Sequence, residues 1–386
     1  MWRGLRSVVL LSSMLAALVI PKPASARERG PRVLVVCPYA PIPARIASHL
    51  VLAYELQITN FDKVPLSLRK LEIFAGSRQA APLESLSGND LATIIYHVGA
   101  NDPVESSQVV NPGNLIVAFV WVEIPSGIPL PKSLGHRMTF LEAGVKSSEP
   151  LLPAESTIER LNVPVSGESM PVLDSPFQGG VWVAGDGPAN DSAHRRSLLA
   201  IDGHVHAPER FASDWVKVGP NGDSRRGTAH NEDYWCYNEP ILAVADGEVT
   251  QVSDGIPDNT PRQLPKQISL DNILGNYIVL RIAPDRYVTY AHLRQGSVKV
   301  SPHERVKRGN VIARLGNSGQ TTGPHLHMQV TNGNSGLESD GVPFVFRGFT
   351  DLGPGSDYET DKHPSIPRTE SLPGKDEVVR FAIAGK

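Results

Sequence analysis

Two histidines one residue apart, His325 and His327, are the residues in this sequence best placed to do chemistry. Residues 324–330 have the pattern of a β-strand, in which alternate side chains point to the same face. The two imidazoles should therefore project together, about 7 Å apart, with Leu326 on the opposite face. Such a pair suits a metal site, where one ring binds the ion and the other faces a substrate. Two surface histidines on an edge strand would show the same spacing.

Other candidate residues also lie in the second half of the chain, which contains nine of the twelve histidines after residue 190. His292 ends an aromatic-rich strand pattern, where a packed core histidine is the simpler interpretation. Asp214 stands in an apolar frame that runs from Arg210 to Trp215. A carboxylate in such surroundings needs a partner, and an ordinary ion pair would supply one.

The elements that must position these residues read as β-strands throughout the second half. Residues 275–282 and 287–293 form a predicted hairpin around Pro284-Asp285. Residues 243–252 have a second hairpin signature, with Asp246-Gly247 at the turn. Helix signals are sparse.

The first half also reads as β-structure. Residues 49–59, 66–74 and 115–124 combine β-branched or aromatic residues with partial alternation. Several short strands separated by turn residues favour a small antiparallel sandwich. Its histidines are scattered, so a supporting or binding role is expected for this half.

Residues 1–26 have the features of a secretory signal peptide: a basic start, a short apolar run and a small-residue cleavage site. Later apolar stretches fall short of the ~20 residues of a membrane span. The mature chain is therefore expected to be exported and soluble, without a transmembrane segment. Loss of Arg3, Arg6 and Lys22 would move the formal net charge from −3 to −6. That acidic balance, without a basic tract, argues against nucleic-acid binding.

The two cysteines, Cys37 and Cys236, follow the signal segment. They could form one disulfide in an oxidising compartment, although sequence does not show that they meet. The absence of a C-x-x-C pair argues against a cysteine-based zinc ribbon. Neither a His-Glu-x-x-His helix nor a Gly-x-Ser-x-Gly elbow is present.

Several motifs occur together in order over roughly residues 190–335. They are the Asp246-Gly247 hairpin, Tyr290-Ala291-His292-Leu293, the run from Val306 to Gly319, and Thr322-Gly323-Pro324-His325-Leu326-His327. On these motifs the second half resembles the lysostaphin/LytM-type zinc endopeptidases, which cleave peptides in bacterial cell-wall peptidoglycan. The resemblance implies a compact antiparallel β domain with zinc in a groove.

In that family a histidine, an aspartate four residues later and the second histidine of His-x-His bind zinc. The resemblance therefore implies Asp214 and His327 as zinc ligands, with His292 and His325 facing the substrate. Three protein ligands and one water are what a catalytic zinc requires.

Arg210 stands four residues before Asp214, where the family pattern has its first histidine. A guanidinium cannot ligate zinc, so the third ligand must come from elsewhere. We expect His194, because an insertion between it and Asp214 could loop out and return the imidazole. His204 and His206 are the alternative third ligands. The last alternative is a site that has no third ligand.

The predicted fold is all-β, with a small N-terminal antiparallel β-sandwich followed by a compact antiparallel β peptidase domain. The predicted organisation is signal peptide 1–26, linker 27–44, sandwich 45–149, linker 150–185, zinc peptidase-like domain 186–350 and C-terminal tail 351–386. The expected function is an exported, periplasmic or extracellular zinc metalloendopeptidase that acts on peptidoglycan or another peptide. The alternative is a metal-free relative that binds cell wall or regulates another hydrolase. The oligomeric state is left open.

Overall fold

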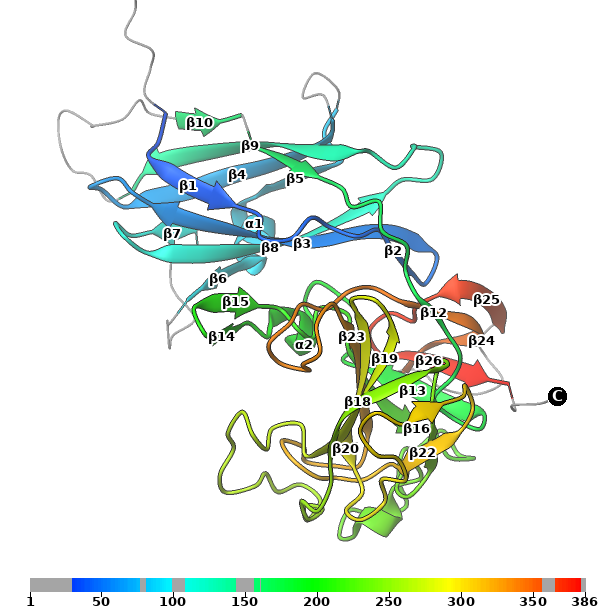
Figure 1. Cartoon of the computed structure of the whole chain (residues 1–386). Helices are drawn as coiled ribbons and strands as arrows, with labels where there is room; N and C mark the ends of the chain where they lie inside the picture. The colour runs from blue at the N-terminus through cyan, green and yellow to red at the C-terminus, as the bar shows by residue number, and fades with distance from the viewer. Residues whose placement is uncertain are drawn as a thin grey trace, which may run out of the picture.

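The computed structural model describes residues 30–76, 81–98, 108–143, 156–159, 161–355 and 365–382. The predicted signal peptide lies outside these ranges. The described chain is nearly all strand, and all but one of its strand pairings described here are antiparallel. Its helical elements are α1 (Gly88–Thr93), α2 (Ala193–Arg196) and the 3-10 turn η1 (Asn231–Asp233). None of the helices in these ranges is long and apolar enough to cross a membrane. The all-β prediction is confirmed (Figure 1).

The N-terminal part is a sandwich of two sheets. The first sheet contains β1 (Val33–Val36), β2 (Ala44–Ile46), β3 (His49–Asn60), β6 (Ile95–His97) and β8 (Leu115–Ile124). The second contains β4 (Leu66–Ala75), β5 (Glu84–Ser87), β7 (Val109–Val110), β9 (Ser133–Glu142), β10 (Ser156–Ile158) and β11 (Asn162–Pro164). Apolar residues from both sheets, such as Leu52, Leu68 and Phe140, form one core between them. The strands predicted at 49–59, 66–74 and 115–124 are confirmed as β3, β4 and β8.

The C-terminal part is built on an eleven-stranded sheet. Its main path runs β12 (Val172–Leu173), β24 (Val345–Pro354), β26 (Glu377–Phe381), β13 (Gly180–Gly185), β16 (Ser213–Lys217), β23 (Leu326–Thr331), β20 (Arg286–Leu293), β19 (Asn276–Ala283), β18 (Gly247–Ser253) and β21 (Arg305–Val306), with β25 (Ile366–Ser371) beside β24. Two small sheets join β14 (Leu199–Ile201) to β15 (His204–His206), and β17 (Pro240–Leu242) to β22 (Val311–Arg314). The sheet therefore brings together strands far apart in the sequence.

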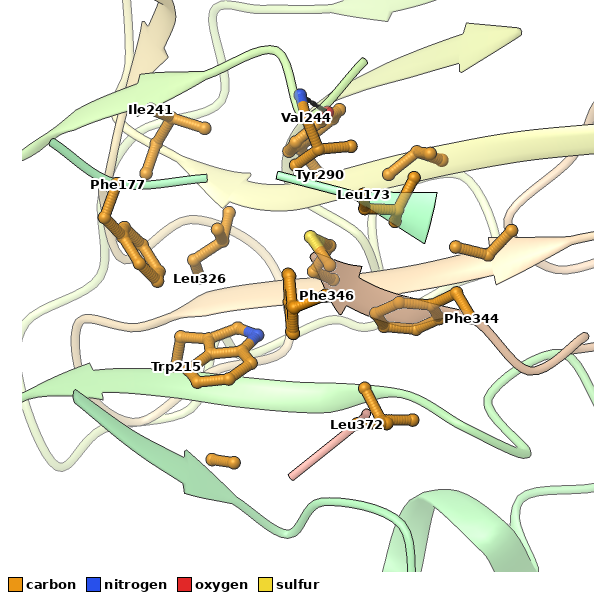
Figure 2. Packing of buried hydrophobic residues seen from close by; sticks show 14 of the residues in the cluster. Leu173, Phe177, Trp215, Ile241, Val244, Tyr290, Leu326, Phe344, Phe346 and Leu372 are labelled. Carbon is orange, nitrogen blue, oxygen red and sulfur yellow. Dashed lines mark hydrogen bonds between the residues drawn. The ribbon is translucent and has the colours of Figure 1, made fainter. Parts of the chain in front are cut away.

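An aromatic core packs against this sheet (Figure 2). Phe177 stacks on Trp182 with ring centroids 3.5 Å apart, and it meets Trp215 edge-on. Tyr290 is fully buried, and its hydroxyl accepts a hydrogen bond of 3.0 Å from the Val244 N–H. This packing fixes β16 and β20, the strands that lie on either side of β23.

One face of β3 packs into the aromatic core of the C-terminal part. Its even-numbered residues, such as Leu52 and Leu56, pack inside the sandwich. Val51 and Ala53 point the other way and join the core of the C-terminal part. Because alternate residues of a strand face opposite sides, β3 ties the two parts of the molecule together.

Segments predicted as linkers or tail contribute strands to these sheets. β1 lies within residues 27–44 and pairs with β3, and residues 150–185 supply β10 to β13. Residues 351–386 supply β25 and β26, and β26 lies inside the large sheet between β24 and β13. These segments form strands because short apolar stretches, with residues such as Val378 and Phe381, become buried. The surrounding sequence hides these stretches from a prediction based on composition.

The hairpin predicted at residues 275–293 is confirmed as β19 and β20. The hairpin predicted at residues 243–252 is wrong, because β17 pairs with β22 whereas β18 pairs with β19 and β21. Asp246 instead accepts the N–H of Arg308, so it closes a contact between two loops. Cys37 and Cys236 are both free thiols in the structure.

Candidate metal centre

Strand pairing places the first two candidate ligands side by side. β16 and β23 are antiparallel, and their register sets Asp214 directly opposite His327. His327 Nδ1 lies 3.0 Å from Asp214 Oδ1. His325, just before β23, brings its Nε2 to 3.4 Å from Asp214 Oδ2. The two histidines therefore face the same carboxylate, as alternation along a strand predicts.

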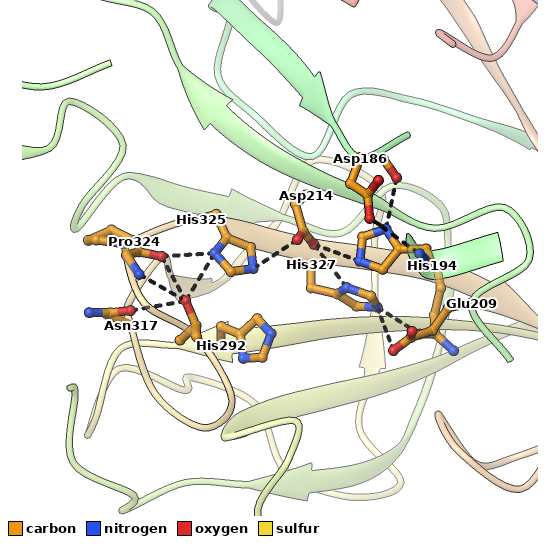
Figure 3. Close-up of polar contacts among 12 residues, drawn as sticks. Asp186, His194, Glu209, Asp214, His292, Asn317, Pro324, His325 and His327 are labelled. Atoms are coloured by element: carbon orange, nitrogen blue, oxygen red, sulfur yellow. Dashed lines mark hydrogen bonds and ion pairs between the residues drawn. The ribbon is translucent and has the colours of Figure 1, made fainter. Parts of the chain in front are cut away.

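The third candidate ligand reaches Asp214 from a different element (Figure 3). His194, on the four-residue helix α2, places Nε2 3.4 Å from Asp214 Oδ1. Ligand atoms of His194, Asp214 and His327 all lie within 4.8 Å of one another. Their side chains are mostly shielded, with exposed fractions of 12%, 28% and 4%.

Hydrogen bonds fix the tautomer of His327. The Gln329 amide nitrogen donates to the carbonyls of Gly336, at 2.9 Å, and Pro208, at 3.2 Å. The Gln329 amide oxygen is thereby left to accept from His327 Nε2 at 2.7 Å. In the neutral ring the proton is on Nε2, so the lone pair of Nδ1 points at Asp214.

His194 has the complementary arrangement. Its Nδ1 donates to the backbone carbonyl of Asp186 at 2.9 Å, which leaves the Nε2 lone pair facing Asp214. Two lone pairs and a carboxylate oxygen thus converge on one point. Such a group of acceptors is favourable only around a cation, either a proton or a metal ion.

The spacing of these atoms suits zinc. Nitrogen and oxygen ligands at about 2.0–2.2 Å in tetrahedral coordination lie roughly 3.3–3.6 Å apart. The separations of 3.0 and 3.4 Å around Asp214 Oδ1 are close to that range. Two imidazoles and one carboxylate are also a ligand set that catalytic zinc sites use.

The electrostatics of the site favour positive charge at its centre. Burial opposes ionisation of Asp214, but the neighbouring His325, His194 and His327 hold its pKa well below its usual range. Burial also opposes protonation of His194, but the hydrogen bond and charge of Asp214 raise its pKa to about 9. The pKa of His327 is raised by Asp214 in the same way, against burial.

A second histidine pair lies beside this centre. His292 and His325 rings are 4.7 Å apart between centroids. Their Nδ1 atoms donate to the carbonyls of Ser318 and Gly323, each at 2.8 Å, so the lone pair of each neutral ring is on Nε2. Burial and the nearby charges of His325 and His327 hold the pKa of His292 well below its usual value.

His292 has a strained backbone, with φ of 59°. A non-glycine residue rarely adopts this left-handed conformation, and it persists where the surrounding structure enforces it. The His292 N–H donates to Leu274 at 3.0 Å, and its carbonyl accepts from Gly316 at 3.1 Å. A Cβ on Gly316 would lie 2.3 Å from the backbone nitrogen of Arg294, so the loop can approach His292 only with glycine there.

The remaining candidates from the sequence lie elsewhere. His206 contacts Asp340 at 3.3 Å, and His204 is exposed on the same strand β15. Arg210 is buried and directed toward Glu55 of the sandwich. Sequence reasoning missed Gln329, which alternation from His327 could have indicated, and Asp186, for which the sequence carries no signal.

Residues 233–339 match the family model described as Peptidase family M23. This range contains His292, His325 and His327 and begins after His194 and Asp214. A peptidoglycan DD-endopeptidase, ShyC, of Vibrio cholerae serotype O1 is 41% identical over 90 residues, or 23% of this chain and 17% of that protein. An uncharacterized metalloprotease of Haemophilus influenzae is 33% identical over 90 residues, or 23% of this chain and 15% of that protein. The chain thus spans less than a fifth of these curated relatives.

The chain also shows similarity to solved structures. The catalytic domain of lysostaphin from Staphylococcus simulans is 21% identical, covering 41% of this chain and 85% of that chain, with a TM-score of 0.22. A zinc containing peptidase from Vibrio cholerae is 16% identical, covering 77% and 81%, with a TM-score of 0.23. The resemblance of the C-terminal half to lysostaphin/LytM-type peptidases is confirmed by the family match and the curated relatives.

Proposed function

We propose that this protein is an exported zinc-dependent endopeptidase that hydrolyses peptide bonds in peptidoglycan cross-links. The observation that carries the proposal is the convergence of His194, Asp214 and His327 on one point, with both imidazole lone pairs directed there. Beside them, His292 and His325 present two further Nε2 atoms, and that of His325 lies 3.4 Å from Asp214 Oδ2. Such a set joins a metal site to groups that can move protons.

His194, Asp214 and His327 would hold the zinc ion. Gln329 would keep the His327 ring, and Asp186 the His194 ring, in the tautomer that binds metal. When bound, zinc lowers the pKa of water toward ~7 and polarises a carbonyl. We assign proton transfer and stabilisation of the oxyanion to His292 and His325. One ring accepts the proton of the attacking water at Nε2 and passes that proton to the leaving amine, and its partner, when protonated at Nε2, stabilises the developing oxyanion. Their rings are close enough to act on one peptide group.

The substrate class rests on similarity and on the N-terminal sequence. The relative from Vibrio cholerae is named as a peptidoglycan endopeptidase. The family M23 model matches the segment that carries His292, His325 and His327. A signal-like segment at residues 1–26 would carry the chain to the compartment that contains peptidoglycan. Both features support an exported cell-wall hydrolase.

The metal-free alternative was motivated by Arg210, which replaces the expected first ligand. The position of His194, 3.4 Å from Asp214, weighs against that alternative because it supplies a nitrogen as the third ligand beside Asp214 and His327. A protein that only binds cell wall would have no chemical use for four histidines around one carboxylate.

The test compares the metal content and peptidoglycan hydrolysis of the purified wild type, His194→Ala and His206→Ala. We expect about one zinc per chain in the wild type and in His206→Ala, and loss of both zinc and hydrolysis in His194→Ala. Zinc retained by His194→Ala but lost from His206→Ala would move the third ligand to β15. A wild type that binds no supplied zinc would refute the enzyme and favour the binding or regulatory role.

A further inference from the structure

The residue after His194 points in the opposite direction, into the sandwich. Arg195 is completely buried, and its guanidinium donates to the carboxylate of Glu55 on β3. It also donates to the Tyr54 carbonyl at 2.9 Å. Adjacent side chains of α2 therefore reach two different parts of the molecule, with His194 directed to Asp214 and Arg195 directed to β3.

Two more side chains attach this segment to the sandwich. The Asn190 amide donates to the Phe119 carbonyl of β8 at 2.9 Å. Arg196 donates to the Thr93 carbonyl at 3.1 Å, and its guanidinium lies 4.6 Å from the centre of the Phe119 ring. The chain on both sides of His194 is thus docked on the N-terminal part.

The segment has little order of its own. α2 is four residues long, and Ser192 at its N-cap makes no side-chain capping bond. A helix this short is not stable without tertiary contacts. On the C-terminal part the segment is bound through Asp186, whose carboxylate accepts the backbone N–H groups of Ala193 and His194. The contacts of Asn190, Arg195 and Arg196 with the sandwich hold the segment from the opposite side.

The same Glu55 carboxylate also binds Arg210. Arg210 donates to Oε1 through Nε at 2.9 Å and to Oε2 at 2.7 Å, and it reaches Asp340 at 3.2 Å. Burial opposes ionisation of Glu55, but Arg210 and Arg195 lower its pKa to about 2. Glu55 is therefore a buried anion that joins two arginines of the C-terminal part.

We propose that Glu55 is a positioning residue for the metal centre: the sandwich holds Arg195, which fixes α2 so that His194 reaches Asp214. This inference rests on the proposed zinc site. It also gives Arg210 a role. Arg210 occupies the position of the family's first ligand, and by binding Glu55 it strengthens the contact that places His194, the substitute ligand. The N-terminal part thus supplies the order that His194 needs, although it contributes no ligand itself.

The experiment uses the full chain and two matched carboxyl-to-amide changes. Glu55→Gln weakens the hold on Arg195. Asp340→Asn alters the far side of Arg210 and the Asp340 contacts with His206 and the Ala207 N–H, but it leaves the contact between Glu55 and Arg195 in place. Zinc affinity is measured by chelator competition, and Co²⁺ absorption reports coordination geometry. We expect Glu55→Gln to bind zinc about 10–100-fold more weakly with an altered Co²⁺ spectrum, and Asp340→Asn to stay within about threefold of the wild type.

A second measurement does not depend on metal. Amide hydrogen exchange in the metal-free proteins should accelerate across residues 190–197 in Glu55→Gln and remain unchanged there in Asp340→Asn. If Glu55→Gln does not fold, Asn190→Ala, which removes one hydrogen bond to Phe119, replaces it and should show a smaller effect in the same direction.

Unchanged affinity and unchanged exchange in Glu55→Gln would overturn the inference, as would an equal loss in Asp340→Asn. A wild type that fails to bind zinc would refute the proposed function alone, and exchange across residues 190–197 would then decide whether Glu55 orders the segment. Failure of the two proposals is thereby distinguishable.

Discussion

The two sides of the candidate metal centre are built in different ways. On one side, β16 and β23 set Asp214 opposite His327 by their strand register, inside a sheet that packs on an aromatic core. On the other side, His194 stands on a four-residue helix that is supported from the sandwich through Arg195. Register needs only the sheet, whereas the position of His194 needs contacts from residues more than 100 positions away.

If His194, Asp214 and His327 bind zinc as we propose, this difference lets the site keep its chemistry when one ligand position changes. The strand side keeps the His-x-His pair and the aspartate in the places that the resemblance implies. The helix side supplies a nitrogen from a new direction, and Arg210 takes a structural role instead. A cation site requires donor atoms at the right point, but it does not require them to come from one element.

The largest expected effect comes from removing the ligand on the strand side. His327→Ala should abolish zinc binding and lower kcat/KM by more than about 10³-fold, because several kcal/mol of transition-state stabilisation depend on the metal. Zinc content and peptide hydrolysis measure both changes. If His194→Ala lost zinc while His327→Ala kept it, the strand side would not be the firmer half of the site.

Removing a proton-transfer group should separate chemistry from metal binding. His325→Ala is expected to keep about one zinc per chain but to lose about 10²-fold or more in kcat. His303→Ala, whose side chain is exposed, is the matched control and should behave as the wild type. Loss of zinc in His325→Ala would place this histidine among the ligands.

A smaller effect is expected from the residue that orients His327. Gln329→Leu removes the acceptor of the His327 Nε2 proton and should weaken zinc binding by about 10–100-fold. The control is Gln295→Leu at an exposed position, which should leave affinity unchanged. Equal affinity in the wild type and Gln329→Leu would show that the strand alone fixes the ring.

The last prediction tests the helix side and has the smallest expected effect on catalysis. It concerns the free energy of unfolding at acidic pH. The pKa of Glu55 is about 2 in the folded protein, compared with an ordinary value of 4.5. Its ionised form therefore stabilises the fold above pH 4.5, and this contribution, up to about 3 kcal/mol, is lost as the pH falls from 4.5 toward 2. Denaturant unfolding of Glu55→Gln should show a smaller loss over that interval than the wild type does. Parallel losses in both proteins would contradict the assignment.

Features governed by local pattern could be predicted from the sequence. The strands containing His49 and Leu115 were predictable because alternation and turn residues lie within a short window. The shared direction of His325 and His327 followed from strand geometry in the same way. The Asp214–His327 pairing came from the resemblance, and the structure places these residues in register.

Long-range pairing could not be predicted. β26 occupies an inner position although its residues read as a tail, because two or three buried side chains in a short strand give little periodic signal. The Asp246-Gly247 turn signature misled because its flanking strands found other partners. Glu55 carried no sign of its contact with Arg195, since a charged residue in an alternating strand normally indicates a face exposed to solvent.

The inner position of β26 has a consequence for the order in which the protein forms. β26 pairs with β24 on one side and β13 on the other, and β13 in turn pairs with β16, which carries Asp214. Until residue 381 has been synthesised, the sheet has a gap two strands away from Asp214. A nascent chain on the ribosome therefore lacks the finished sheet, and a hydrolase of this design would become competent only after its late strand has closed the gap.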